Sequence, residues 1–238
     1  MAVNIDTVYQ KVLAIANKEQ RGYITPQEFN LYANLAQQEI FEQYFYDLNQ
    51  QARIPGNEYI HSDVDDILEE KIQVFERVQT SGFSNAIHVN YGYPKPSHAY
   101  RVTKLQYSGA DVEILKTKDF LDCLNGGPLT RPSDKRPIGN IKTNYMDIRG
   151  SDLNVSLKPT YMTYIRKPNQ VNWGYFVVGG SALYDSNSSK TKHFQHHDSE
   201  EIELIYKILK LAGISMKSAD LASSAQNMEN TLDQKEKQ

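Results

Sequence analysis

The chain of 238 residues is poor in cysteine, with Cys123 alone, and lacks any long run of apolar residues. One cysteine excludes an intramolecular disulfide and indicates a reducing compartment. No stretch approaches the about 20 apolar residues that cross a bilayer. The opening residues, MAVNIDTVYQK, lack the basic segment and apolar core of a secretory signal. We therefore expect a protein that is made in the cytoplasm and has no membrane partner.

An excess of positive charge is also missing. The net charge is −3 and the sequence pI is about 6.1. Such a balance argues against a surface that coats nucleic acid, although the protein can still surround DNA without gripping its phosphates.

Signatures of catalysis or cofactor binding are absent too. There is no G-x-S-x-G elbow, and no glycine-rich loop ends in Lys-Ser/Thr. His193, His196 and His197 beside Asp198 come nearest to a metal cluster, but adjacent histidines point in different directions in most backbone conformations. We predict no catalytic residue, no cofactor and no metal. A small enzyme or metal-binding module built on this histidine segment is the least favoured alternative.

A long helix is the clearest feature that is present. Thr25 can cap it, Pro26 suits its first position, and Glu28 completes a capping box, so a helix is predicted over 25–50. Two neighbouring apolar faces follow helical spacing, which indicates burial on more than one side. The first face comprises Phe29, Ala33, Ala36, Ile40 and Tyr44, and the second comprises Leu31, Leu35, Phe41, Phe45 and Leu48.

Three further helices are predicted from capping residues and apolar spacing. The first covers 5–20 with Asn4 or Asp6 as its cap. The next begins at Ser62 or Asp63 and runs to Gln79. The last covers 199–212, with Asp198 or Ser199 as its N-cap and Gly213 as its C-cap.

Short apolar runs between close turn signals indicate an antiparallel sheet, sandwich or small barrel in the middle of the chain. A short helix over 116–125 interrupts them. The predicted strands are 86–91, 100–107 with a hairpin into 112–115, 144–149, 154–157 and 161–166. Residues 173–178 either pair as a further strand or simply pack.

These elements together predict an α+β fold. We expect a helical bundle over 1–80, a β-rich domain over 81–184, a loop and helix returning to the bundle over 185–214, and an extended tail over 215–238. The tail from Ser218 onward is polar and has weak helical potential. An ordered tail would be held by a neighbouring chain.

Tyrosine is unusually frequent, with 16 residues against 8 Phe and 1 Trp. Tyrosine joins a large apolar ring to a polar end, which suits partly wet interfaces. It is equally favoured in β-strands, so its abundance alone leaves both explanations open.

Three blocks of sequence carry a resemblance to a known class of virion proteins. They are KVLAIANKEQRGYITPQEFNLYANLAQQEIFEQYF (11–45), YIRKPNQVNWGYFVV (164–178) and HFQHHDSEEIELIYKILKLAGISM (193–216). The chain resembles the head–tail connector proteins, also called portal adaptor or ring proteins, of short-tailed phages, particularly of the crAss-like type. The resemblance implies a helical bundle beside a β domain, as the residues themselves predict.

The resemblance also implies a function. About twelve copies would form a ring at the portal–tail vertex of the virion, because a heterologous interface closes by rotation. The ring would dock on the portal protein through the C-terminal tail, continue the channel for genomic DNA without sequence-specific binding, and support the next tail or ring protein. Another virion component, such as a tail, minor capsid or cargo protein, is the alternative.

We expect the contacts between chains to use aromatic and apolar side chains of the long helix, of the segment around Trp173 and of the tail. The predicted partner-binding residues are Phe41, Tyr44, Phe45, Tyr46, Trp173, Tyr175, Leu221, Met228 and Leu232.

Overall fold

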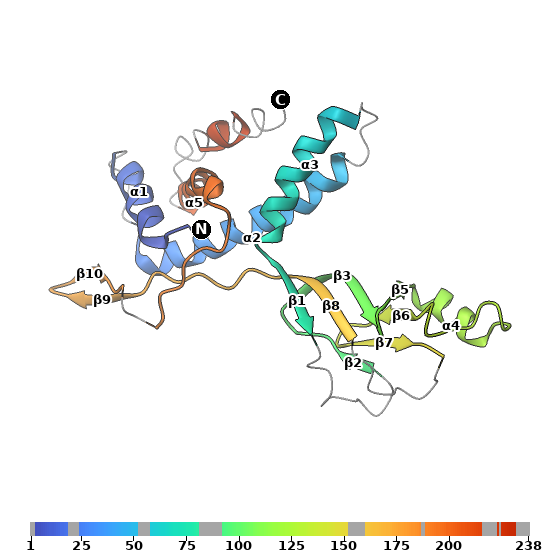
Figure 1. Ribbon diagram of the computed structural model, residues 1–238. Helices are drawn as coiled ribbons and strands as arrows, with labels where there is room; N and C mark the ends of the chain where they lie inside the picture. Colours follow the sequence, from blue (N-terminus) through green and yellow to red (C-terminus); the bar gives the residue numbers. More distant parts are fainter. Residues whose placement is uncertain are drawn as a thin grey trace. The chain divides into compact units, whose positions relative to one another are not determined.

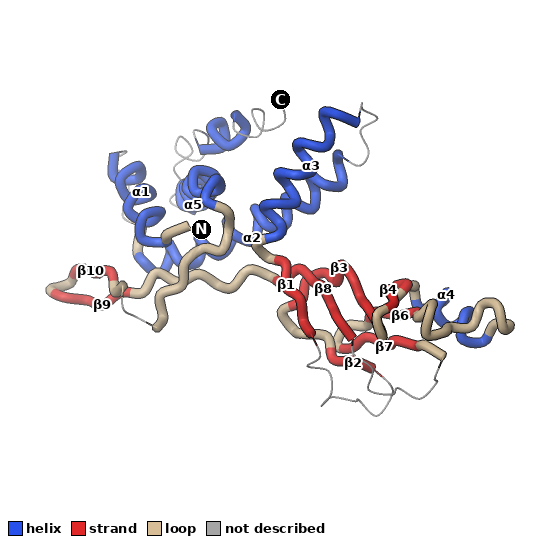
Figure 2. Tube along the Cα trace, in the orientation of Figure 1, coloured by secondary structure: helices blue, strands red, loops and turns tan. Residues whose placement is uncertain are grey.

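The computed structural model describes residues 3–18, 24–51, 58–80, 92–151, 160–186, 189–215, 223 and 225–231. Within them the chain has the predicted α+β fold, drawn in Figures 1 and 2. It divides into two compact units. The helical unit comprises Met1–Val74 and Pro168–Gln238, and the β unit comprises Phe75–Lys167. None of the helices described is long and apolar enough to span a bilayer.

This division differs from the expected boundaries at residues 80 and 184. Residues 76–80 form a strand that pairs inside the β unit, so they do not extend the helical bundle. Residues 168–184 belong with the helices, because polar side chains of the long helix bind that segment.

The first two helices begin as the sequence predicts. Helix α1 (Ile5–Lys18) is capped by Asn4, whose Oδ1 accepts a hydrogen bond from the Asp6 amide at 2.9 Å. Helix α2 (Pro26–Gln51) begins with a complete capping box. Thr25 Oγ1 accepts from the Glu28 amide at 3.3 Å, and Glu28 Oε2 accepts from the Thr25 amide at 3.0 Å.

Only one of the two apolar faces of α2 is fully covered. The face from Phe29 to Tyr44 is buried throughout. On the second face Phe41 is buried, but Leu31 and Leu35 are 66% and 55% exposed. The expectation that both faces are buried is therefore wrong for the N-terminal half of α2 within this subunit.

Helix α3 (Glu58–Gln73) begins earlier and ends earlier than predicted. The sequence ERVQT, expected to continue the helix to Gln79, forms strand β1 (Glu76–Thr80) instead. It pairs antiparallel with strand β8 (Thr160–Arg166), from Glu76 opposite Ile165 to Thr80 opposite Tyr161. Pairing with a distant strand stabilises these residues more than a helical conformation would, because only a few residues remain to extend the helix.

The C-terminal helix also differs in detail. Helix α5 (Glu201–Ser215) follows the short 3-10 helix η2 (Asp198–Glu200) and packs on α1 and α2. The helical segment begins with η2, which is capped by His197 and not by Asp198 or Ser199, and the His197 side chain accepts from the Ser199 amide. Gly213 was predicted to end the helix, but it lies buried inside it. Glycine lowers helix propensity without forcing a helix to stop, and α5 continues for two more residues to Ser215.

The β unit contains two four-stranded sheets. In one the strand order is β1-β8-β3-β4, and in the other it is β2-β7-β6-β5. All pairs are antiparallel except β5 with β6. The remaining bounds are β2 (Gly92–Pro94), β3 (Ala99–Tyr107), β4 (Ala110–Asp111), β5 (Glu113–Ile114), β6 (Ile138–Ile141), β7 (Tyr145–Arg149) and β8 (Thr160–Arg166).

The two sheets share one core, as the sheets of a sandwich do, and they do not close into a barrel within the described residues. The core comprises Tyr93, Ala99, Leu105, Tyr107, Val112, Met146, Ile148, Met162 and Tyr164. Helix α4 (Thr117–Asn125) packs against β6 at the predicted place.

Two predicted strand segments, 86–91 and 154–157, lie outside the described residues. The predicted hairpin after β3 is present but short. Ser108 and Gly109 form its turn with φ of 52° and 84°, and only Ala110–Asp111 pairs back on β3. The following residues, Glu113–Ile114, join the other sheet.

Candidate assembly surface

An extended segment of the chain runs along α2 and is fixed there by asparagines. Asn34 Oδ1 accepts from the Val171 amide at 2.9 Å, and Asn34 Nδ2 donates to the Val171 carbonyl at 2.9 Å. One turn earlier, Asn30 Oδ1 accepts from the Trp173 amide at 2.7 Å. Spacing of four residues puts both asparagines on one side of the helix. They satisfy backbone groups that would otherwise be buried without partners.

Trp173 anchors the segment in an aromatic cluster. Its ring centroid lies 4.3 Å from that of Tyr9, 5.7 Å from Tyr175 and 5.8 Å from Tyr184. Its Nε1–H donates to Asp6 Oδ1 at 2.9 Å, so the buried indole has a hydrogen-bond partner. Trp173 therefore belongs to the core of the helical unit.

A two-stranded hairpin rises from this cluster. Strand β9 (Tyr175–Val178) pairs with β10 (Ser181–Tyr184), with Val178 opposite Ser181. Gly179 and Gly180 form the two-residue turn with φ of 58° and 85°. Positive φ at both positions is the type I′ geometry that matches the twist of a hairpin. The two glycines thus explain why the chain reverses here. Figure 1 shows the hairpin at one end of the helical unit.

Apolar side chains on the hairpin remain uncovered. Phe176 and Leu183 face each other across the strands and are 48% and 46% exposed, while Val177 and Val178 are 64% and 56% exposed. An isolated two-stranded hairpin has little stability of its own in water. A group of exposed apolar side chains marks an interaction site. We call Phe176, Val177, Val178 and Leu183 the hairpin patch.

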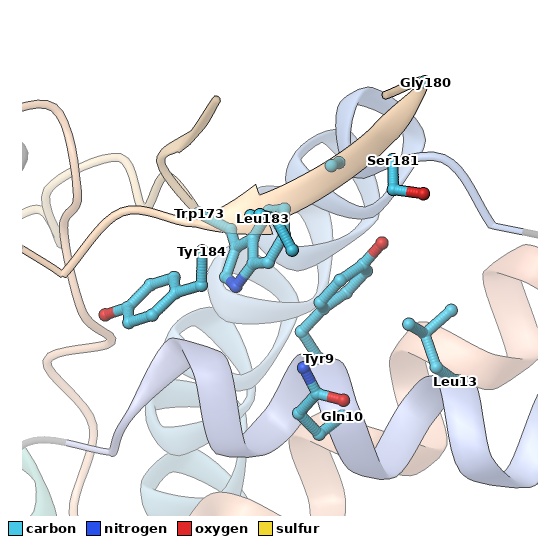
Figure 3. Close-up of a pocket in the computed structure, with 9 residues that line it drawn as sticks. Tyr9, Gln10, Leu13, Trp173, Gly180, Ser181, Leu183 and Tyr184 are labelled. Carbon is cyan, nitrogen blue, oxygen red and sulfur yellow. The ribbon is translucent and has the colours of Figure 1, made fainter. Parts of the chain in front are cut away.

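A cavity of about 500 Å³ opens between α1 and the hairpin, as Figure 3 shows. Tyr9, Gln10 and Leu13 line it from α1, and Trp173 and 180–184 line it from the other side. Burial, with the charges of Asp6 and Asp185 after it, raises the pKa of the Tyr184 phenol. No His, Cys, Lys, Arg or carboxylate is among the lining residues.

The predicted partner-binding residues are split by the structure. Phe41, Tyr44 and Trp173 are buried within the subunit, so they are core residues of the helical unit and are not available to a partner. Phe45 and Tyr175 are partly exposed, and Tyr46 and Met228 are exposed. Leu221 and Leu232 lie outside the described residues. The hairpin patch was missed, although the sequence YFVVGGSALY places a Gly-Gly turn between two apolar runs and therefore contained the signal.

The described part of the tail is helical rather than extended. Residues 225–231 form a helix in which Ala225 and Glu229 are buried. Glu229 binds two lysines of α5, Lys207 at 2.7 Å and Lys210 at 3.0 Å. A contact within the chain therefore holds this part of the tail, which corrects the expectation of an extended tail ordered by a neighbour.

Lys207 is the centre of this contact. We call Lys207, Lys210 and Glu229 the tail seat. Lys207 Nζ also lies 3.3 Å from Glu39 and 3.4 Å from Glu203. Burial alone would lower the pKa of Lys207, but the hydrogen bond to Glu229 and the nearby carboxylates outweigh it and raise the pKa above its usual value. Burial would likewise raise the pKa of Glu229, but Lys207 and Lys210 hold it lower. Both groups are therefore charged at neutral pH.

The three neighbouring histidines have separate roles. His193 Nδ1 accepts from the Ile5 amide at 3.3 Å. The His196 ring lies 3.0 Å from the Gln37 carbonyl, and His197 caps η2. Among the residues described, no group of three or more His, Cys, Asp or Glu is placed to hold a metal ion. The geometry gives these histidines structural contacts that explain their positions.

Comparison of the sequence with models of known protein families gives no match, and no curated protein is similar to it. Function is therefore inferred from the surface of the chain and from the resemblance of its three sequence blocks.

Proposed function

We propose that this protein is a structural subunit of a phage head–tail connector, a ring placed between the portal and the tail. The observation that carries the proposal is the hairpin patch, an apolar surface on a projecting hairpin that the subunit does not cover. The resemblance of 11–45, 164–178 and 193–216 to connector proteins supports the same function.

A ring requires two different surfaces on each subunit, one fitting the opposite surface of the next copy. The hairpin patch is one candidate, and the exposed Leu31 and Leu35 on α2 are another. Burying such side chains contributes about 25 cal/mol per Å² of apolar area. Each surface alone is small, so assembly would need several contacts or a template. The portal would provide that template.

In this proposal the ring continues the DNA channel and supports the next component of the tail. The C-terminal tail makes the portal contact, with the exposed Met228 as an apolar anchor.

The test combines this protein with the portal protein of the same phage genome and examines the mixture by electron microscopy and native mass spectrometry. We expect portal-bound rings of about twelve copies. The variant Phe176→Ser/Leu183→Ser should abolish the rings, since it removes apolar area without altering the backbone pairing. Leu129→Ser is the matched control, because Leu129 is an exposed leucine of the β unit outside the hairpin patch.

Persistent monomers without portal association would contradict the proposal. Binding to another virion protein, with none to the portal, would instead favour a tail, minor capsid or cargo protein.

A further inference from the structure

The charge of the chain is unequally divided between its two units. The β unit has 14 Lys and Arg against 8 Asp and Glu, a net charge of +6. The helical unit has 12 Lys and Arg against 21 Asp and Glu, a net charge of −9. The overall charge of −3 therefore hides two units of opposite sign.

Part of the positive charge gathers at one end of the sheet β1-β8-β3-β4. Arg101 of β3 lies opposite Ile165 of β8, and Arg166 and Lys167 follow directly. The Lys167 amide donates to the His98 carbonyl at 2.9 Å, which brings the start of β3 to the same place. Arg77, on the other side of β8, lies opposite Tyr164. We call Arg77, His98, Arg101, Arg166 and Lys167 the basic end.

Two exposed members of this group, Arg101 and Lys167, are not neutralised by a carboxylate of the described residues. Arg101 and Lys167 are exposed and form no ion pair in the part of the chain that the structure describes. Glu76 of β1 is the carboxylate in register with this end of the sheet, opposite Ile165, and it forms no ion pair with Arg101 or Lys167. The positive charge of Arg101 and Lys167 is therefore available to a partner.

The helical unit has a surface of opposite charge on α3. The helix contains six acidic residues and one basic residue, Lys71. Lys71 is mostly buried and lies 2.7 Å from Glu200, so it does not offset the outer charges. Asp66, Glu69 and Glu70 are exposed, and their spacing of three and four residues places them on one side of the helix. We call these three residues the acidic face.

We propose that the basic end of one copy binds the acidic face of α3 on the next copy, an inference that rests on the proposed ring. One chain carries both surfaces, so the contact is heterologous and repeats from copy to copy. Opposite charges accelerate encounter and set the relative orientation of the copies. Nucleic acid is a poorer partner for the basic end, because the helical unit of each copy would repel phosphates with a net charge of −9. A second copy is repelled less, because its own β unit of +6 offsets much of that charge and leaves a net charge of only −3.

Paired charge reversals test the contact in the full-length chain. The first variant, Arg101→Glu/Lys167→Glu, reverses the basic end. The second, Glu69→Lys/Glu70→Lys, reverses the acidic face and places cations near a helix C-terminus, where they are favourable. Lys116→Glu/Lys118→Glu is the matched control, since it changes the charge of the β unit equally but lies at the start of α4. Circular dichroism verifies folding, and the neutral variant Arg101→Gln/Lys167→Gln replaces the first variant where its reversal disturbs β3.

Self-association is measured by sedimentation velocity at low salt, about 20 mM, and at about 0.5 M, where screening removes most of the attraction. We expect salt-sensitive association of the natural chain and of the control. Each reversal alone should weaken it about tenfold or more, because like charges then meet. A mixture of the two reversal variants should restore it, since the reversed basic end of one then fits the reversed acidic face of the other.

Restoration in the mixture is specific to contact between chains. Restoration only when all four substitutions are in one chain would show that the two surfaces meet within a subunit, and would overturn the proposal. Unchanged association of the reversal variants would also overturn it. So would binding of a labelled DNA duplex that Arg101→Glu/Lys167→Glu abolishes without weakening self-association.

The connector function and the charge contact can fail independently. If the reversal variants form portal-bound rings as well as the natural chain does, the charge contact is refuted and the connector function stands. Restoration in the mixture without any portal binding would leave the charge contact intact and refute the connector.

Discussion

His196 is fully buried in the helical unit and holds the loop before α5 against α2. Its Nε2 lies 3.0 Å from the Gln37 carbonyl, and its Nδ1 lies 3.3 Å from the Tyr44 hydroxyl. A neutral imidazole satisfies both contacts, with Nε2–H donating to the carbonyl and Nδ1 accepting from the hydroxyl. Burial lowers the pKa of His196 to about 4, despite the opposing effects of the Gln37 carbonyl and Glu200. The ring is therefore neutral in the folded protein at pH 7.

The depressed pKa predicts that acid destabilises the helical unit. His196 takes up a proton near pH 6.5 in the unfolded chain but only near pH 4 in the folded chain. Stability is therefore complete above about pH 6.5 and declines as the pH falls toward 4, by about 2 kcal/mol between pH 7 and pH 5. Urea unfolding followed by Trp173 fluorescence at pH 7, 6 and 5 measures this. His196→Gln should remove most of the pH dependence, while His197→Gln should retain it. A full pH dependence in His196→Gln would show that another group is responsible.

Among the elements, those whose ends depend on neighbouring residues were predictable, and those that depend on distant pairing were not. The capping box of Thr25 and Glu28 forms as expected because all its atoms come from one turn of chain. Residues 76–80 continue a helical pattern locally, yet they form β1 because β8, about 85 residues later, offers a partner strand. The extended segment at Val171 is likewise fixed by Asn34, which no local pattern reveals. Sequence periodicity contains nothing about such long-range partners.

The candidate surface was harder to predict for a related reason. Phe41, Tyr44 and Trp173 are large aromatic residues that suit either a core or an interface, and composition cannot separate the two. Their burial follows from packing among α1, α2, α5 and the 169–173 segment. The ion pairs of Glu229 could not be predicted from the polar composition of the tail, because its partner lysines lie one helix earlier, in α5.

The tail helix gives a prediction at this scale, because ion pairs of Glu229 join it to α5. Glu229→Gln should weaken the seat by about 1–3 kcal/mol, less than a fully broken buried pair, because Lys207 keeps Glu39 and Glu203. Hydrogen exchange over 225–231 should become about tenfold or more faster, and the rest of the helical unit should be unaffected. Asn227→Ala is the matched control, as Asn227 is exposed on the same helix.

The pH dependence of the seat has a definite sign. Because the pKa of Glu229 is lowered in the folded state, its contribution is complete above the ordinary glutamate pKa and is lost as the pH falls below it. Protection of the tail should therefore persist at pH 5 and disappear in stronger acid. Equal protection of the natural chain and Glu229→Gln at pH 7 would show that other contacts hold the tail.

For the whole molecule, the two units have separate cores, and the chain passes between them at Val74–Phe75 and Lys167–Pro168. The β unit is continuous in sequence, and the helical unit is assembled from the two ends of the chain. A unit with its own core can unfold as its own cooperative transition.

The single tryptophan makes this independence measurable, because Trp173 lies in the core of the helical unit and the β unit has none. Met162 is fully buried in the shared core of the two sheets, so Met162→Ala should destabilise the β unit by about 2–5 kcal/mol. Hydrogen exchange over 99–107 should then accelerate, while the urea midpoint reported by Trp173 fluorescence stays the same. Leu204→Ala, at a buried position of α5, should have the reverse effect. If Met162→Ala lowers the Trp173 midpoint as much as it destabilises β3, the two units unfold together, and an interface between them must stabilise the subunit before it meets any neighbour.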